Sequence, residues 1–377
     1  MRITDVSILI HERPWHLKGF LSSSGKLPFH VLTIETDEGV TGNTFISGPA
    51  GDAPGQIIRM LKPMLLGRNP LDIGAIWHDM WRRNRMLAPM AMGCVDVALW
   101  DIAGKVAGLP VHRMLGTVKE KVPVYFSAFQ HARAQDFADE AKHWQAQGWR
   151  GYKLHPPTQR RMFGEDTSIL DDIAACEAIR SAVGEEMVLM LDPACAYDYS
   201  DALVVGRAVE DLHYAWIEDP LPADDLYGYT RLKQKLTIPI VATEMTAGGL
   251  YAFPYWITER ATDALRGDVA MKGGITGMMK IAHLAEAFHL PLEVHDAYNG
   301  ANNVATLHVI AACGNASWFE VLPFNEAGQT GVDKFWYGLA EAPQIDADGF
   351  AHVPEQPGLG LVIDWDLLKS AVIGELT

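Results

Sequence analysis

Short apolar runs alternate with amphipathic segments through the middle of the chain. The runs are five to seven residues long and lie at residues 122–128, 151–155, 187–192, 215–219, 238–244, 264–270, 290–295 and 318–322. Segments with helical spacing of apolar residues separate them, for example 169–183 and 277–289. Strands that are apolar throughout are typical of parallel sheets covered on both faces. The pattern therefore predicts a (β/α)8 barrel, in which one helix can be shortened or replaced.

The first part of the chain, residues 1–118, has a different pattern. Strand-like alternation opens it, and residues 37–39 (Asp-Glu-Gly) predict a turn between two strands. The clearest helix of this part ends at Gly108 and Pro110. Its apolar face recurs at spacings of three and four residues, at Met92, Val95, Leu99, Ile102 and Val106.

The last part of the chain, residues 326–377, is rich in glycine and proline. Residues 346–349 (Asp-Ala-Asp-Gly) predict a hairpin turn, and residues 365–372 form one amphipathic stretch. Because this part is too short to fold alone, we expect it to pack on the first part. The predicted organisation therefore has three parts, 1–118, a barrel at 119–325, and 326–377.

Charge and cysteine usage narrow the function classes. The chain has 31 Lys and Arg against 47 Asp and Glu, a net charge of −16, so it lacks the basic character of a nucleic-acid or anionic-membrane binder. Its four cysteines are far apart and form no C-x-x-C pair, which indicates reduced thiols. The N-terminus resembles a strand rather than a signal peptide, and no run approaches the ~18 apolar residues of a membrane span. These features predict a soluble, cytoplasmic protein.

Acidic residues end three successive apolar runs. Asp192, Glu218 and Glu244 close the third, fourth and fifth runs at intervals of 26 residues. One such residue alone is usually a surface or capping residue, and Asp192 before Pro193 also fits a turn. Three at equivalent strand ends would converge at the barrel mouth, where carboxylates repel one another unless a cation joins them. Since no His or Cys accompanies them in sequence, oxygen donors favour Mg²⁺ over zinc.

The neighbouring strand ends carry acid–base groups. The sixth run contains Asp268 and the seventh ends at His295, so the two can form a dyad in which the carboxylate fixes the tautomer of the imidazole. The eighth run contains Glu320, expected to point inward at the same rim, as a functional group or as an ordinary buried carboxylate. The second run ends in Lys153-Leu154-His155. No Walker loop, G-x-S-x-G, H-E-x-x-H or G-x-G-x-x-G motif occurs.

Several dispersed motifs resemble the mandelate racemase subgroup of the enolase superfamily. They are MAMGCVDVALWDIAGKVAGLPVHRMLG in the first part, the strand-end residues above, and PEQPGLGLVID near the end. The first motif matches a hallmark helix and turn of that family at Asp96, Trp100, Asp101, Gly104, Lys105 and residues 108–110. The resemblance covers nearly the whole chain. It implies a modified (β/α)7β barrel with an α+β capping domain built from the two chain ends.

The resemblance also implies roles for the strand-end residues. It implies one Mg²⁺ held by Asp192, Glu218 and Glu244, a dyad of Asp268 and His295, and a carboxylate-binding role for Glu320. The family usually carries Lys-x-Lys at the second strand, with the second Lys as a base. Here Lys153 matches the first Lys and His155 stands in the place of the second. Either His155 is the substitute base, or it binds substrate and His295 alone abstracts the proton.

The reaction implied by the resemblance begins with abstraction of the proton α to the carboxylate of an acid sugar, with Mg²⁺ stabilising the enediolate. Loss of a β-hydroxyl then gives a 2-keto-3-deoxy acid, which is the dehydratase outcome that we expect. Reprotonation on the other face would give a racemase or epimerase, and ring closure or opening a cycloisomerase. A non-catalytic homologue that binds sugar acids is the alternative of another class, and the complete set of acidic and dyad residues counts against it.

Substrate recognition is expected in loops over the barrel mouth, at residues 16–29 and 48–55. Within the first of these loops, His16, Lys18 and Ser24 could contact the hydroxyls or the distal carboxylate of a substrate, or could belong to a solvated lid. The expected partner is a small acid sugar. The resemblance, together with the aromatic-rich first part, predicts an even-numbered homo-oligomer.

Overall fold

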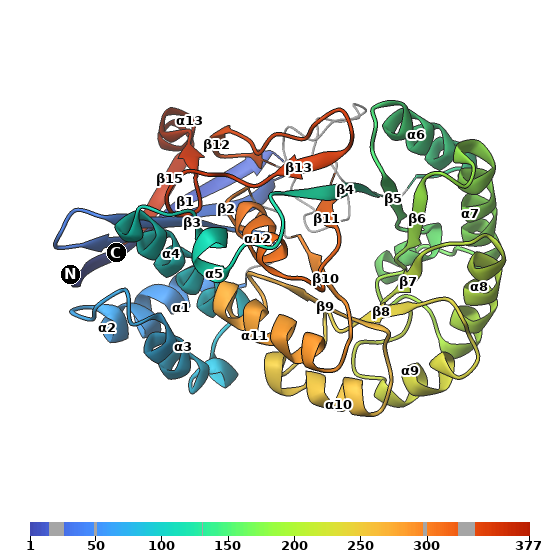
Figure 1. Ribbon diagram of the computed structural model, residues 1–377, viewed down its shortest axis with the longest axis horizontal. Coiled ribbons are helices and arrows are strands. Elements are labelled where there is room, and N and C mark those ends of the chain that lie inside the picture. Colours follow the sequence, from blue (N-terminus) through green and yellow to red (C-terminus); the bar gives the residue numbers. More distant parts are fainter. Residues whose placement is uncertain (15–25, 49–50, 130, 297–299, 323–335) are drawn as a thin grey trace.

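A parallel barrel and a smaller antiparallel sheet with its helices make up the described part of the chain. The computed structural model describes residues 1–14, 26–48, 51–129, 131–296, 300–322 and 336–377. In Figure 1 the barrel lies on the right and the smaller sheet on the left, where both chain ends also lie. The residues expected over the mouth, His16, Lys18 and Ser24, are outside the described ranges.

The barrel consists of eight parallel strands in chain order. They are β4 (Lys121–Ala128), β5 (Gly151–Leu154), β6 (Val188–Leu191), β7 (Trp216–Glu218), β8 (Ile240–Ala242), β9 (Ala264–Asp268), β10 (Leu292–His295) and β11 (Phe319–Val321). Strand β11 pairs in parallel with β4, and an isolated bridge from Leu292 to Ala316 links β10 to the segment before β11. The ring is therefore nearly closed, and all eight predicted strands are confirmed.

Seven helices follow the first seven strands and form the outer layer. They are α6 (Ala134–Ala146), α7 (Ile169–Val183), α8 (Tyr199–Asp211), α9 (Leu226–Lys233), α10 (Phe253–Thr258), α11 (Gly274–Ala287) and α12 (Gly300–Ala312). Short 3-10 turns at η3 (Pro157–Phe163) and η4 (Gly249–Tyr251) precede α7 and α10. Strand–helix units that end in a single strand make a (β/α)7β barrel, which confirms the predicted architecture.

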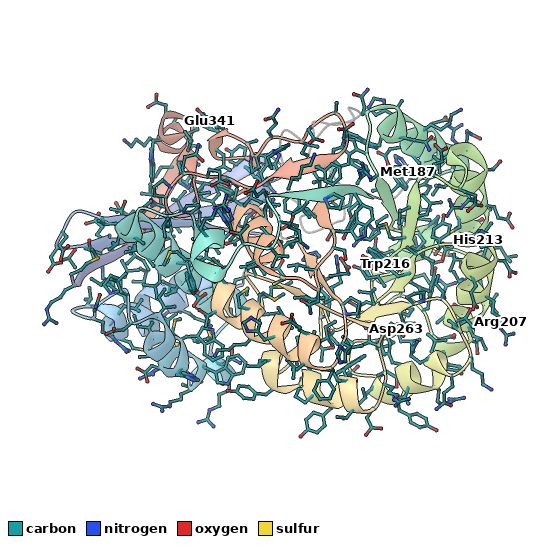
Figure 2. The ribbon with its side chains drawn as sticks, in the orientation of Figure 1. Met187, Arg207, His213, Trp216, Asp263 and Glu341 are labelled. Carbon is teal, nitrogen blue, oxygen red and sulfur yellow. The ribbon has the colours of Figure 1, made fainter. Side chains whose placement is uncertain are left out.

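Alternation along the strands decides which residues reach the mouth. Met190 and Trp216 belong to the apolar cluster inside the barrel, near its amino-terminal end. Asp192 and Glu218 lie two residues further along, so they face the same interior, closer to the carboxyl-terminal end. Figure 2 labels Trp216 inside the ring of strands, whereas Arg207 on α8 lies on the outer layer. The inner strand positions therefore change from apolar to charged toward the mouth.

The first and last strands of the chain share the smaller sheet. Its order is β15 (Val372–Leu376), β1 (Ile3–Pro14), β2 (Lys26–Thr36) and β3 (Thr41–Ser47), all antiparallel. The predicted turn at residues 37–39 joins β2 to β3. The predicted amphipathic stretch at residues 365–372 is helical only as far as α13 (Trp365–Ser370), and the mixed polar and apolar residues after it form β15.

The remaining elements complete this capping layer. The helices are α1 (Ala53–Gln56), η1 (Ile57–Leu61), α2 (Lys62–Leu65), α3 (Ile73–Trp81), η2 (Asn84–Met86), α4 (Pro89–Ala107) and α5 (Val111–Leu115). The strands are β12 (Leu339–Glu341), β13 (Phe350–His352) and β14 (Val362–Ile363). The predicted hairpin turn at residues 346–349 directly precedes β13, which pairs with β4. The limits 1–118, 119–325 and 326–377 stay predictions.

Helix α4, the predicted hallmark helix, packs between the cap and the barrel. Pro89 begins it and Gly108, with φ of 67°, ends it in the left-handed conformation. The predicted apolar face is buried except at Val106, which is 41% exposed in the last turn. A Cβ at Gly93 would lie 2.0 Å from the carbonyl oxygen of Ala270, so glycine permits the close approach of α4 to the loop after β9.

Two polar residues of α4 contact the start of helix α11. Asp96 Oδ2 accepts a hydrogen bond of 2.9 Å from the backbone N–H of Thr276, at the start of α11. Burial raises the pKa of Asp96 to about 7. Trp100 Nε1 donates to the hydroxyl of the same Thr276 at 2.9 Å. These motif residues therefore orient the helix that follows β9.

Asp101 joins the sheet and the C-terminal segment to α4. It is fully buried, and its carboxylate accepts from the backbone N–H groups of Asn43 and Leu359, each at 3.0 Å, and from Lys105 Nζ at 2.7 Å. Buried backbone donors without partners are costly. One carboxylate therefore accepts hydrogen bonds from donors in β3, in α4 and in the chain near residue 359.

We predict that Asp101→Ala destabilises the protein by about 2–5 kcal/mol, because two buried backbone N–H groups lose their acceptor. The measurement is the thermal midpoint, which should fall by several degrees, relative to Asp211→Ala at an exposed position of α8. Equal midpoints for the two variants would show that the Asp101 contacts contribute little.

Among the described residues, no helix combines the length and hydropathy of a membrane-spanning segment.

Candidate active site

Two basic and two acidic side chains that contact one another lie fully buried inside the carboxyl-terminal half of the barrel. Lys153 of β5, Glu218 of β7, Arg266 of β9 and Glu320 of β11 are each at most 1% exposed. Three of them were predicted as site residues from their positions in the strands. The fourth, Arg266, was not. We call these four residues the charge network.

Lys153 contacts three carboxylates. Its Nζ lies 2.7 Å from Glu320 Oε1, 2.8 Å from Glu218 Oε1 and 3.1 Å from Asp192 Oδ2. Burial lowers the pKa of Lys153, but the carboxylates of Glu218 and Glu320 outweigh that effect and hold its pKa well above the usual value. The ammonium group therefore acts in this arrangement as a fixed positive charge.

Arg266 contacts a partly different set of carboxylates. Its Nε lies 2.6 Å from Glu218 Oε1 and 3.1 Å from Glu244 Oε2, and its Nη2 lies 2.6 Å from Glu320 Oε2. Nη1 donates to the hydroxyl of Tyr125 at 3.4 Å. The guanidinium thus joins residues from β7, β11 and the loop after β8. Its position two residues before Asp268, on the same side of β9, was the sequence signal that could have identified it.

Asp192 and His155 lie closer to the opening. Asp192 Oδ2 lies 3.1 Å from His155 Nε2, and Asp192 Oδ1 accepts from the backbone N–H of Ala194 at 2.9 Å. His155 Nδ1 lies 2.7 Å from the carbonyl oxygen of Ala128. Both ring nitrogens of His155 therefore face acceptor oxygens, and a neutral ring can donate to only one of them.

The predicted dyad is formed across β9 and β10. His295 Nδ1 lies 2.8 Å from Asp268 Oδ2, and His295 Nε2 lies 3.5 Å from Glu244 Oε1. Burial lowers the pKa of His295, but the carboxylate of Glu244 and the hydrogen bond to Asp268 outweigh it, so the pKa is raised. Strand pairing places Asp268 directly beside His295. Nε2 therefore lies on the side of the ring that faces the other acidic residues.

The three carboxylates that contact Lys153 have different proton affinities. Although burial alone raises the pKa of Asp192 and Glu320, the ammonium of Lys153 outweighs it and holds both pKa values well below normal. Burial raises the pKa of Glu218 well above normal; Arg266 opposes this effect and Asp192 adds to it. Glu218 therefore binds a proton more readily than Asp192 or Glu320 does.

The residues fit a divalent cation by their chemistry. Asp192, Glu218 and Glu244 supply only oxygen donors, as Mg²⁺ prefers; Lys153 contacts the first two carboxylates, and Arg266 contacts the last two. Across the described ranges, no three acidic, histidine or cysteine side chains converge on a single point as a formed metal centre requires. In this arrangement the ammonium and guanidinium groups bridge the carboxylates instead.

Strained backbone accompanies each of the three carboxylates. Non-glycine residues in the left-handed region lie next to them or within three positions. They are Ala194 (φ 50°), Cys195 (φ 65°), Asp219 (φ 34°) and Thr243 (φ 94°). Such conformations cost about 1–3 kcal/mol each and gather at functional sites, because only a well-determined structure retains them. The strain therefore marks the same strand ends as the charges do.

A cavity of about 220 Å³ borders Glu244 on the side of the capping helices. Trp81 and Asn84 line it from the cap, and Thr246 and Lys272 from the barrel loops. Lys272 is buried, donates to the carbonyl oxygen of Thr246 at 2.8 Å, and has a pKa lowered by burial to about 8. Sequence analysis did not identify these four residues, because the cap meets the barrel only in three dimensions.

A larger depression of about 560 Å³ lies at the opposite end of the barrel, beside Met187, which Figure 2 labels, and Trp149. Among the described residues that line it, none is a predicted site residue. The charged residues favour the carboxyl-terminal end as the functional one.

Comparison with known proteins finds the same two-part organisation. The N-terminal domain model of the mandelate racemase/muconate lactonizing enzyme family matches residues 3–116, and the enolase C-terminal domain-like model matches residues 136–367. A protein of Saccharolobus solfataricus named arabinonate dehydratase is 32% identical over 341 residues, 88% of this chain and 87% of that protein. A 3,6-anhydro-alpha-L-galactonate cycloisomerase of Streptomyces coelicolor is 27% identical, covering 92% and 93%.

Solved structures give the same result. The structure of D-glucarate dehydratase from Agrobacterium tumefaciens complexed with magnesium superposes with a TM-score of 0.89 and 32% identity, covering 99% of this chain and 100% of that one. The family matches span both the cap and the barrel, and they confirm the resemblance inferred from the motifs. The chain belongs to the enolase superfamily, in the mandelate racemase subgroup.

Proposed function

We propose that this protein is a Mg²⁺-dependent dehydratase of an acid sugar, which forms a 2-keto-3-deoxy acid. The observation that carries the proposal is the dyad of Asp268 and His295, set 3.5 Å from a carboxylate of the predicted metal-binding residues. The relatives named arabinonate dehydratase, D-xylonate dehydratase and D-galactonate dehydratase support this reaction class. The competing proposal of a non-catalytic sugar-acid-binding protein gives no reason for a buried dyad beside acidic residues.

His295 is the proposed acid–base group. Asp268 holds Nδ1–H, so the lone pair of the neutral ring lies at Nε2, the nitrogen that faces the cluster. The α C–H bond of the substrate breaks and its proton passes to Nε2. The β C–O bond then breaks, and the departing hydroxyl takes that proton and leaves as water. The enol that remains becomes the 2-keto acid when C3 takes a proton and the hydroxyl on C2 loses one.

The carboxylates are the proposed metal ligands. Asp192, Glu218 and Glu244 would hold the Mg²⁺ ion, which supplies Lewis-acid stabilisation for charge that develops on the substrate carboxylate, worth several kcal/mol. Lys153 and Glu320 form an ion pair of 2.7 Å, and Lys153 also contacts Asp192 and Glu218. We propose that Lys153 adds positive charge near the substrate carboxylate, and that Glu320 fixes the orientation of Lys153.

A cycloisomerase or epimerase is the second candidate. Two cycloisomerases are among the relatives at 27% and 28% identity, and His155 and His295 stand on different strands around the mouth. Two acid–base groups on different sides of a substrate would allow removal of a proton from one face and delivery of a proton to the other. The family usually has Lys where His155 stands, and this replacement favours the one-base elimination.

The cavity beside Glu244 is the proposed place for the distal end of the substrate. Asn84 and Trp81 would contact hydroxyls there, with Trp81 held by stacking on Trp77 at 5.3 Å between ring centroids. We expect the protein to act in the cytoplasm, in keeping with four free cysteines, three of them buried. The homo-oligomer stays a prediction.

The direct test is a screen of the purified protein with Mg²⁺ against a library of aldonic and aldaric acids, read by formation of 2-keto-3-deoxy acid. Isomerised products without water loss would favour the second candidate. Binding of an acid sugar without any exchange of its α-proton would favour the non-catalytic one.

We predict that Glu218→Gln lowers both Mg²⁺ affinity and turnover by about 100-fold or more, because a charged donor is lost. Calorimetric titration with Mg²⁺ and steady-state assays measure the two effects. Glu186→Gln, at an exposed position near the opposite end of the barrel, is the control. Full activity after exhaustive chelation would refute the metal assignment.

We predict that His295→Asn abolishes dehydration and also the exchange of the α-proton with D₂O, since one group performs both steps. His283→Asn, exposed on α11, should leave both unchanged. Exchange that survives while dehydration stops would make His295 only the acid and move the base to β5. Dehydration at the wild-type rate would contradict the dyad assignment.

We predict that Asn84→Ala raises KM by about five- to tenfold while kcat changes little, which is the loss of one hydrogen bond to a non-reacting part of the substrate. Gln135→Ala, exposed on α6, is the matched control. An unchanged KM would place the distal end of the substrate elsewhere.

A further inference from the structure

Arg266 contacts two of the three predicted metal ligands. Its side chain is fully buried, and its Nε reaches an oxygen of Glu218 and an oxygen of Glu244 at the same time. These are two of the three carboxylates proposed to hold Mg²⁺. The same guanidinium keeps a third contact, from Nη2 to Glu320 Oε2.

The oxygens of Glu218 are both engaged. Oε1 is shared by Arg266 Nε at 2.6 Å and Lys153 Nζ at 2.8 Å, and Oε2 accepts from Trp216 Nε1 at 3.1 Å. A cation that binds Glu218 must therefore share or displace one of these donors. Lys153 retains Asp192 and Glu320 if it releases Glu218, and Arg266 retains Glu320 if it releases Glu218 and Glu244.

The formal charges of these groups indicate how much further positive charge they can balance. Four carboxylates (Asp192, Glu218, Glu244 and Glu320) are connected through two permanent cations, so the fully ionised cluster has a formal charge of −2. One divalent cation would balance that charge. Without the guanidinium of Arg266, the remaining negative charge would be larger by one unit, a severe cost for side chains that are buried.

We propose that Arg266 is an internal counter-ion that holds Glu218 and Glu244 in place before the metal binds and competes with the metal for them. Arg266 is thus a positioning residue, which stabilises the metal-free protein and weakens Mg²⁺ binding. The inference rests on the proposed function, because it takes these carboxylates as the metal ligands. The contact with Glu320 lets the guanidinium stay in the barrel after it releases the other two.

The test compares Arg266→Met with Arg180→Met, a second buried arginine whose contacts are backbone carbonyls, including Leu212 at 2.8 Å and His213 at 2.9 Å. Thermal midpoints are measured with chelator and with saturating Mg²⁺, and Mg²⁺ affinity is measured by calorimetry. Arg266→Met should lower the metal-free midpoint strongly and the Mg²⁺-loaded midpoint less, with affinity raised about tenfold or more. Arg180→Met should lower both midpoints alike without changing the affinity.

Two further variants allow the result to be interpreted even if Arg266→Met is unstable. Arg266→Lys keeps the charge and should stay closer to the wild type in affinity than Arg266→Met. If Arg266→Met does not fold without metal, Arg266→Met/Glu320→Gln restores the formal charge of −2 and should fold, and it should still bind Mg²⁺ more tightly than the wild type. Wild-type protein that binds no Mg²⁺ would refute the metal assignment and this inference with it. Wild-type binding with equal affinity in Arg266→Met would refute only the role of Arg266.

Discussion

The structure depends on a network of charges buried within the barrel mouth. Lys153 and Arg266 have no exposed surface, and each isolated buried charge would cost several kcal/mol. The cost is offset only because Glu218 and Glu320 contact both cations, at 2.6–2.8 Å. No segment of the chain can make this network alone. It requires strands β5, β7, β9 and β11 at fixed positions in one nearly closed ring, so the barrel and the charges stabilise one another.

The cap contributes through a different set of polar contacts. The motif residues Asp96, Trp100 and Asp101 were the strongest family signal in the first part of the chain, and none of them contacts the charge network. Asp96 and Trp100 hold Thr276 at the start of α11, and Asp101 holds backbone donors of Asn43 and Leu359. Their role is to fix α4 against α11, β3 and the C-terminal segment. That placement brings Trp81 and Asn84 to the cavity beside Glu244.

Local pattern and period in the sequence were enough to predict the barrel and its acidic strand ends. Apolar runs located all eight barrel strands, and equal intervals located the three carboxylates. Arg266 was missed because it lies inside an apolar run, ALRGD, where only its spacing from Asp268 shows that it faces the interior. Strand β15 was missed because its mixed residues acquire strand structure only by pairing with β1. The cavity residues could not be predicted, since their grouping depends on how the cap packs on the barrel.

The charged groups lie at different depths in the barrel, in agreement with their different proposed roles. Lys153 lies among three carboxylates with a raised pKa and no exposed surface, which suits a permanent charge rather than a group that exchanges protons with a substrate. His295 is 7% exposed, at the end of β10, and its ring is oriented by one carboxylate at Nδ1. Proton transfer requires a group that can reach the substrate and change charge without disrupting its neighbours. Burial therefore favours a fixed-charge role for the two cations, and the position of His295 at the strand end favours its proposed role in proton transfer.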